Sequence, residues 1–154
     1  MNKEALKRIF DFLERKAEHN APFKWKILNN EPIIEEDLNV KGGLDLSRTK
    51  IETLPEGLKV GGHLDLSQTQ ITSLPKGLEV GGYLSLLDLN ITSLPKGLKV
   101  GGDLTLRGLN ITSLPKGLEV GGNLFIVYSP LKKYTDDQLR EMIYPGFIKG
   151  KIWR

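Results

Sequence analysis

Two aspartates and a histidine are the residues in this sequence that could perform acid–base or metal chemistry. Asp45 and Asp65 lie 20 residues apart, and His63 lies two residues before Asp65. Carboxylate oxygens and imidazole nitrogens bind metal ions, and a carboxyl group beside an imidazole can transfer protons. A metal site needs further ligands, however, and the equivalent position of the next repeat holds Ser85. We therefore expect two solvated carboxylates, and neither a metal site nor a cofactor.

The other patterns that would support catalysis are missing from the sequence. The chain contains no cysteine, which excludes disulfides, thiolate metal sites and a thiol nucleophile. Gly-Gly pairs recur without the Lys-Ser/Thr that completes a phosphate-binding loop. They are predicted to be structural corners in which glycine tolerates a left-handed backbone. The sequence therefore predicts no catalytic residue, and a protein that is not an enzyme.

The spacing of these glycine pairs indicates a repeat protein. Both the Gly-Gly pairs and a set of Leu-Pro pairs advance by 20 residues at each step. The Gly-Gly pairs begin at Gly61, Gly81, Gly101 and Gly121. The Leu-Pro pairs begin at Leu54, Leu74, Leu94 and Leu114. A fixed period of this length is typical of a solenoid, in which stacked units share one core.

The pattern within one unit predicts how the chain coils. Leu84 and Leu86 alternate with polar residues, which predicts a short strand with its leucines directed inward. Pro95 ends any ladder on the returning chain, and Leu98 and Val100 form the expected back wall. Five parallel strands are expected near Asp45, Asp65, Ser85, Thr105 and Phe125. The predicted fold is a repeat solenoid, a parallel β coil of about five 20-residue turns, with α/β caps at both ends.

The segment before the repeats is expected to cap the coil. We assign residues 1–33 to an N-terminal cap and residues 34–134 to the solenoid. Apolar residues at helical spacing, with Asn2 as N-cap, predict a helix over 3–18. Alternating apolar and polar residues predict a strand over 23–28.

Residues 135–154 are expected to form the C-terminal cap. Thr135 is followed three residues later by Gln138, which is the pattern of a capping box that opens a short helix. The apolar residues on either side of Gly150 predict a terminal strand or a hairpin. These elements would cover the open end of the coil, because exposed sheet edges and core leucines require a cap.

The repeat unit resembles the bacterial 20-residue class of leucine-rich repeats. The matching positions of one unit are Leu64, Leu66, Ile71, Leu74 and Pro75. The resemblance covers about two thirds of the chain, and the Gly-Gly variant is similar to short repeat proteins of bacteria and phages. The family's asparagine is replaced by Thr49, Thr69, Leu89, Leu109 and Ser129. Threonine and serine can still bond the backbone, whereas leucine must pack, so a β-helix-like cross-section stays open as an alternative.

Near-identical units differ most on the outer face of the predicted strands. The first column of this face contains Gly43, His63, Tyr83, Asp103 and Asn123. The second contains Asp45, Asp65, Ser85, Thr105 and Phe125, and the third contains Ser47, Ser67, Leu87, Arg107 and Val127. Since core and corner positions stay constant, this variation indicates that the scaffold does not shape the face. The resemblance gives the same face priority as a binding surface.

The candidate residues for binding a partner come from this face and its border. They are Tyr83, Leu87, Arg107, Asp103, Phe125, Val127, Tyr128, His63 and Asp65. Exposed apolar and aromatic residues are typical of interfaces, so we expect a non-enzymatic scaffold for protein–protein interaction. For Phe125 and Val127 the alternative is that the C-terminal cap covers them.

Two other functions remain open from the sequence. Resemblance and small size suggest an alternative role as a phage- or bacterium-encoded inhibitor or adaptor acting on a larger host defence complex. Basic ends, with six basic and three acidic residues in 128–154, permit nucleic-acid binding, although solvated cap lysines are the commoner explanation.

The chain has neither a membrane-spanning apolar run nor a signal-like N-terminus, which predicts an intracellular protein without membrane contact. We expect a monomer or a weak homodimer.

Overall fold

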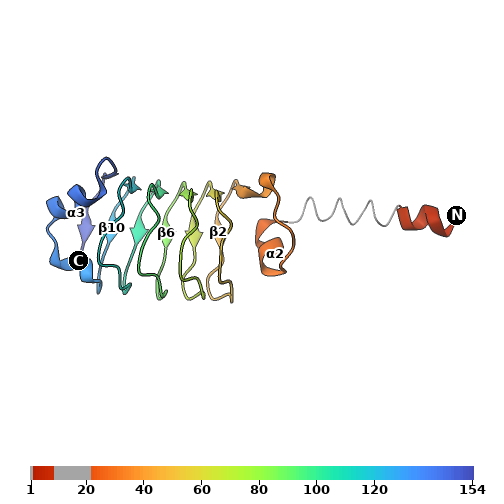
Figure 1. Cartoon of the computed structure of the whole chain (residues 1–154), viewed down its shortest axis with the longest axis horizontal. Coiled ribbons are helices and arrows are strands. Elements are labelled where there is room, and N and C mark those ends of the chain that lie inside the picture. Colours follow the sequence, from red (N-terminus) through yellow and green to blue (C-terminus); the bar gives the residue numbers. More distant parts are fainter. Residues whose placement is uncertain (1, 9–21) are drawn as a thin grey trace.

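The chain forms a parallel β-solenoid, as predicted (Figure 1). The structure is a computed structural model that describes residues 2–8 and 22–154. In this part of the chain, short strands build two parallel sheets of six strands each. Sheet A contains β1 (Asn39–Val40), β3 (Lys59–Val60), β5 (Glu79–Val80), β7 (Lys99–Val100), β9 (Glu119–Val120) and β11 (Phe147–Ile148). Sheet B contains β2 (Leu44–Asp45), β4 (Leu64–Asp65), β6 (Leu84–Ser85), β8 (Leu104–Thr105), β10 (Leu124–Phe125) and β12 (Ile152–Trp153).

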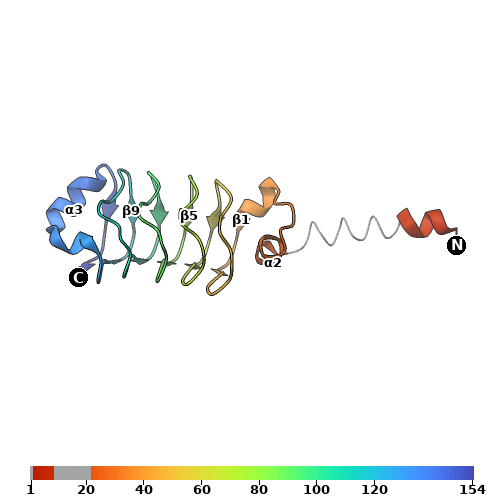
Figure 2. The same cartoon turned by 60° about the horizontal axis from the view of Figure 1, so that its bottom comes forward.

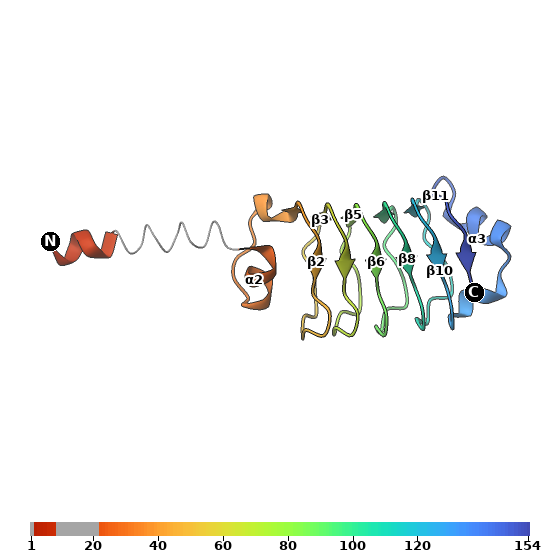
Figure 3. The same cartoon turned by 180° about the vertical axis from the view of Figure 1, so that it is seen from behind.

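The strands of sheet B are the ones that the repeat pattern predicts (Figure 3). Each residue pairs with its equivalent one repeat away, so Leu84 lies between Leu64 and Leu104. Four complete 20-residue windings separate β2 from β10, close to the expected five turns. Sheet A is a finding of the structure, because the sequence predicts only a back wall at Leu98 and Val100. Its strands are two residues long, which is too short to show alternation.

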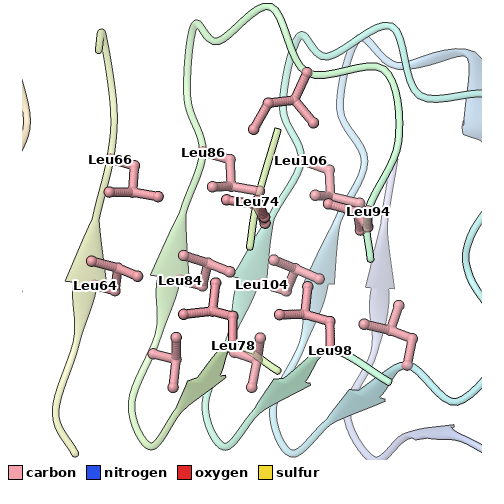
Figure 4. Packing of buried hydrophobic residues seen from close by; sticks show 14 of the residues in the cluster. Leu64, Leu66, Leu74, Leu78, Leu84, Leu86, Leu94, Leu98, Leu104 and Leu106 are labelled. Atoms are coloured by element: carbon pink, nitrogen blue, oxygen red, sulfur yellow. The ribbon is translucent and has the colours of Figure 1, made fainter. Parts of the chain in front are cut away.

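Stacked leucines fill the space between the two sheets (Figure 4). Leu64, Leu84 and Leu104 form one row, and the equivalent residues two positions later form another. All of these side chains are fully buried, and each is worth about 1.5–3 kcal/mol of hydrophobic free energy. One coil cannot bury its own leucines, so the fold is stable only as a stack.

The Gly-Gly corners need glycine for a reason that the sequence does not reveal. We expect a left-handed backbone there, and this is wrong: Gly81, Gly101 and Gly121 are not among the residues with positive φ. Instead the corners stack closely, and a Cβ atom on Gly101 would lie 2.3 Å from the carbonyl oxygen of Gly81. The same overlap occurs at Gly81 and Gly121. Close approach of neighbouring coils therefore excludes every side chain at these corners.

Left-handed backbone occurs at the turn that follows each of the five strands β2, β4, β6, β8 and β10, as well as at the glycine of each Leu-Pro-x-Gly segment. The residues at the turns after the strands are Arg48, Gln68, Asp88, Gly108 and Tyr128, with φ between 57° and 73°. At the next position the hydroxyls of Thr49 and Thr69 donate to backbone carbonyls at 2.6 and 2.8 Å. Leu89 and Leu109 are buried at the same position. The expectation that threonine bonds the backbone here and leucine packs is confirmed.

The strand predicted over 23–28 is wrong, because these residues form helix α2 (Phe23–Leu28). Phe23 and Lys26 are both buried, and their spacing of three residues matches one helical turn. The alternating pattern misleads because it treats Lys26 as a solvent-facing residue. Pro22 occupies the N-cap position of this helix, where its missing N–H is not needed.

A buried ion pair explains why a lysine lies inside the N-terminal cap. The Lys26 Nζ atom donates to both carboxylate oxygens of Asp37, at 2.8 and 2.9 Å. Asp37 belongs to the short 3-10 helix η1 (Glu35–Leu38), and it also accepts from the backbone N–H of Ile34. The pair therefore joins α2 to the segment that leads into β1. Figure 2 shows α2 at that end of the coil, next to β1.

The C-terminal cap follows the sequence prediction closely. Helix α3 (Asp136–Ile143) starts with the predicted capping box between Thr135 and Gln138, and a 3-10 helix, η2 (Pro130–Lys133), precedes it. The two strands around Gly150 are present, but they do not form a hairpin. β11 pairs with β9 in sheet A and β12 pairs with β10 in sheet B, both in parallel. Residues 147–153 therefore form a further coil of the solenoid.

Arg140 closes the corner of this last coil. In each earlier coil the carbonyl oxygens at the corner accept N–H groups from the coil that follows, as Val120 accepts from Lys149 and Gly122 from Gly150. The equivalent carbonyls of the last coil, Ile148 and Gly150, accept from the guanidinium of Arg140 instead. One side chain of α3 thus supplies the donors that another coil would have supplied.

The helix predicted over 3–18 can be followed only in part. Residues 3–8 are helical, and the backbone N–H of Glu4 donates to the Asn2 side chain at 3.0 Å, as expected of an N-cap. The remainder of that prediction lies outside the described residues. Among the helices that the structure describes, none has the length and apolar character needed to cross a membrane.

Candidate binding face

The outward side chains of sheet B form the face on which the repeats vary, which we call the variable face. Its three columns contain the residues that the sequence places there, and β12 extends the second column from Phe125 to Trp153. The parallel register aligns each column along the axis of the coil (Figure 3). The second column lies on the strands, the first lies directly before them and the third lies two residues after them. Neighbouring side chains within a column are about 4.8 Å apart.

Three side chains of the first column bond to the backbone of the neighbouring coil. The prediction that the scaffold does not shape this face is therefore wrong at these positions. The His63 Nδ1 atom accepts from the backbone N–H of Tyr83 at 3.2 Å. Asp103 accepts from the backbone N–H of Asn123 at 2.7 Å, and Asn123 accepts from that of Lys151 at 2.8 Å. These side chains bind the residue that follows the corner of the next coil. Variation is tolerated because imidazole, carboxylate and amide groups all provide an acceptor.

Tyr83 is an exposed aromatic member of this column. Its ring stacks on His63, with the two centroids 4.1 Å apart and the planes 12° from parallel. The side chain is 41% exposed. The stack on His63 holds the ring in place while the side chain stays partly exposed.

Asp45 and Asp65 lie at paired positions of β2 and β4, and each carboxylate bonds to the serine two residues later. The Asp45 carboxylate accepts from both the hydroxyl and the backbone N–H of Ser47, and Asp65 accepts from the N–H of Ser67. The Ser67 hydroxyl lies 2.8 Å from that of Ser85. Within residues 2–8 and 22–154, no group of three or more His, Asp or Glu side chains is placed to hold a metal ion. The two carboxylates fix the backbone at the end of their own strands.

The pKa of Asp45 supports this assignment and gives a testable pH dependence. Hydrogen bonds from the Ser47 hydroxyl and N–H lower the pKa of Asp45 below its usual 3.8, and burial opposes them only in part. A lowered folded-state pKa stabilises the fold above the unfolded value, and this contribution is lost as pH falls through the folded value. We expect an NMR titration to show the lowered pKa, and Ser47→Ala to return it toward 3.8. An unshifted Asp45 resonance in the wild type would contradict the contact.

The late strands of sheet B carry an aromatic pair. The rings of Phe125 and Trp153 lie nearly parallel, 8° apart in angle and 6.3 Å between centroids. Trp153 is 48% exposed, and the ammonium of Lys151 lies 5.8 Å from its ring centroid. Phe125 and Val127 are half-buried, and Trp153 of the C-terminal cap stacks on Phe125, so the cap covers this part of the face in part.

Arg107 and Tyr128 form a second pair at the border of the face. Tyr128 occupies one of the left-handed turn positions, and 71% of its side chain is exposed. The Arg107 guanidinium carbon lies 5.5 Å from the ring centroid, close enough for a cation–π contact. Leu87, in the third column, is half-buried. The structure therefore brings together the candidates of the last repeats, which are Arg107, Phe125, Val127 and Tyr128. His63 and Asp65 lie two or more coils away from them.

Sequence reasoning missed Trp153 as a member of the face. Its position follows once residues 147–153 are aligned with residues 119–125, since Gly150 then matches Gly122 and Trp153 matches Phe125. Two of the basic residues at this end form hydrogen bonds within the chain. Arg140 binds carbonyls, and Arg154 bonds the backbone of Tyr134 and the side chain of Asp136.

Comparisons of this chain with protein-family models, with curated proteins and with solved structures found no match.

Proposed function

We propose that this protein is a non-enzymatic binding module that contacts another protein through the late part of the variable face. We call this region the aromatic patch, and it comprises Arg107, Phe125, Val127, Tyr128 and Trp153. The observation that carries the proposal is the exposure of Tyr128 and Trp153 on a rigid coil, each beside a cation. Aromatic and arginine side chains are the residues that most often dominate binding energy at interfaces.

The charges of the patch suggest the chemistry of the partner. Arg107 and Lys151 project beside the aromatic rings, while the carboxylate of Asp103 is bound to the backbone N–H of Asn123. An acidic segment with apolar side chains would complement both the cations and the rings. The opposite end of the face, around Asp45 and Asp65, presents serines and carboxylates that already have partners within the chain.

We also propose that the coil is a variant of the leucine-rich repeat. Burial of Ile71, Leu74 and their equivalents at the matching positions supports this relationship. Leucine-rich repeats use the outer face of their strands for binding, which agrees with the choice of sheet B. Intracellular location and a role as an inhibitor or adaptor stay predictions.

The proposal can be tested with a charge-matched pair of variants. Arg107→Glu/Tyr128→Asp changes the patch, whereas Lys96→Glu/Thr92→Asp makes the same change in charge on the exposed return arm of the coil. Proteins retained by the immobilised wild type would be identified, purified and measured against all three chains. We expect the first variant to weaken binding at least about 30-fold, as for loss of a hot spot, and the control to bind normally. Equal affinity for the wild type and Arg107→Glu/Tyr128→Asp would refute the proposal.

A further inference from the structure

The outer face of sheet A, whose strands β1, β5 and β9 are labelled in Figure 2, carries a ridge of side chains and a trough beside it. The ridge is one column of charged side chains, Lys59, Glu79, Lys99 and Glu119. The trough follows the glycine corners two residues later, where no side chain fits between neighbouring coils. Together they line an open groove of about 540 Å³ that extends from Asn39 to Lys149.

The charges of the ridge alternate in sign along the coil. Within one chain this alternation gives a Lys59–Glu79 pair with an N–O distance of 3.6 Å. Both side chains are about half exposed, so water and salt screen the pair and it adds little to stability. The alternating charges therefore contribute little to the stability of a single chain, and contact with another molecule is the other role that such a row can have.

Four alternating charges in a row are self-complementary when two copies run in opposite directions. A two-fold axis between β5 and β7 places Lys59 opposite the second copy's Glu119, and Glu79 opposite the second copy's Lys99. All four facing pairs are then of opposite sign. A parallel arrangement in register would instead place like charges together, which is unfavourable.

We propose that two copies of this chain associate antiparallel through sheet A, with the charged ridges of the two copies facing each other. The corners beside the ridge are bare glycine backbone over four successive coils, so no side chain there hinders the approach of the second ridge. A two-fold interface uses the same patch on both subunits, so a self-complementary patch is what such a dimer requires. This surface lies on the other sheet from the aromatic patch, and a dimer would leave both patches accessible.

The dimensions and end charges of the face set the strength of the dimer. Six strands spaced about 4.8 Å span roughly 24 Å, which is short for an interface of the usual 1,200–2,000 Å². The two-fold axis also brings Lys41 toward the second copy's Lys149, an unfavourable pair at each end. We therefore expect micromolar or weaker association that decreases with salt.

The test uses two variants that keep the composition and net charge of the wild type. Lys99→Glu/Glu119→Lys exchanges two residues of the ridge, so that the antiparallel dimer would place like charges opposite each other at every position. Lys59→Glu/Glu79→Lys/Lys99→Glu/Glu119→Lys reverses every sign and keeps the row self-complementary. Sedimentation equilibrium over a concentration series at low salt would measure the self-association of all three full chains.

We expect the wild type and the fully reversed variant to dimerise alike, and the exchanged variant to associate at least about tenfold more weakly. Arg107→Glu/Tyr128→Asp is expected to dimerise normally, which separates this proposal from the aromatic patch. A wild type that stays monomeric throughout the series would overturn the proposal. So would an exchanged variant that dimerises as well as the wild type, since the dimer would then use another surface.

Discussion

Gly101→Ala is expected to lower the free energy of unfolding by about 3 kcal/mol, although it adds a single methyl group. The added Cβ atom would lie 2.3 Å from the carbonyl oxygen of Gly81 and 3.1 Å from its carbonyl carbon. Both atoms belong to backbone that is held by the hydrogen bond from the Gly101 N–H to the carbonyl of Val80. No side-chain rotation can relieve the overlap, so the two coils must separate. Equilibrium urea unfolding measures the loss.

Gly97→Ala is the matched control for this prediction. Gly97 has a φ of 71°, but a Cβ atom there would meet no atom within 4 Å. Its cost is the left-handed backbone alone, about 1 kcal/mol. We expect Gly101→Ala to be clearly the more damaging of the two. The reverse order would show that backbone conformation, and not the close stacking of coils, selects glycine in this repeat.

Asp37→Ala is expected to destabilise the N-terminal cap by about 3–5 kcal/mol, because it leaves the ammonium of Lys26 buried without its carboxylate. The Lys26 side chain is 4% exposed, and both of its bonds to Asp37 are shorter than 3 Å. The substitution also removes the acceptor of the Ile34 N–H. Hydrogen exchange of α2 and η1, together with urea unfolding, would report the loss.

The double variant Lys26→Met/Asp37→Ala distinguishes the buried charge from simple loss of packing. Methionine fills most of the lysine volume and carries no charge, so the double variant should recover much of the stability that Asp37→Ala loses. If the double variant is as unstable as Asp37→Ala, the effect comes from the lost hydrogen bond to Ile34 or from packing. The ion pair would then contribute little to the cap.

The repeat period was enough to predict the coil. Leu64, Leu66 and their equivalents set both the inward face and the register, since a shift by one residue would turn these leucines to solvent. The capping box of α3 was also predictable, because it depends on local hydrogen bonds between Thr135 and Gln138. Local patterns and exact repetition carry this information within the sequence itself.

What the sequence could not predict depends on contacts between distant residues. Lys26 is buried because Asp37, eleven positions later, neutralises it, so no local pattern marks α2 as a helix. The glycine corners are selected by the carbonyl of the preceding coil, which lies 20 residues away in sequence. For the candidate site, Tyr83, Arg107 and Tyr128 could be placed from the repeat. The backbone contacts of His63 and Asp103 could not, because side-chain acceptors of any type fit that position.

The alternating charges of Lys59, Glu79, Lys99 and Glu119 were visible in the sequence but had no evident meaning. They fall in segments of two residues that give no sign of being strands, so their alignment in one column became apparent only with sheet A. The prediction of a weak homodimer assigned no surface to it. The structure offers one surface whose charge pattern fits a second copy.

Arg140 has a consequence for how the length of this protein can change. Because its guanidinium occupies the carbonyls that a following winding would use, a further winding could stack on this end only after displacement of α3. Gene duplication can still enlarge the molecule by inserting whole units between the caps. Each insertion would lengthen the coil by about 4.8 Å and leave both caps unchanged. Related proteins should therefore differ in length by whole repeat units.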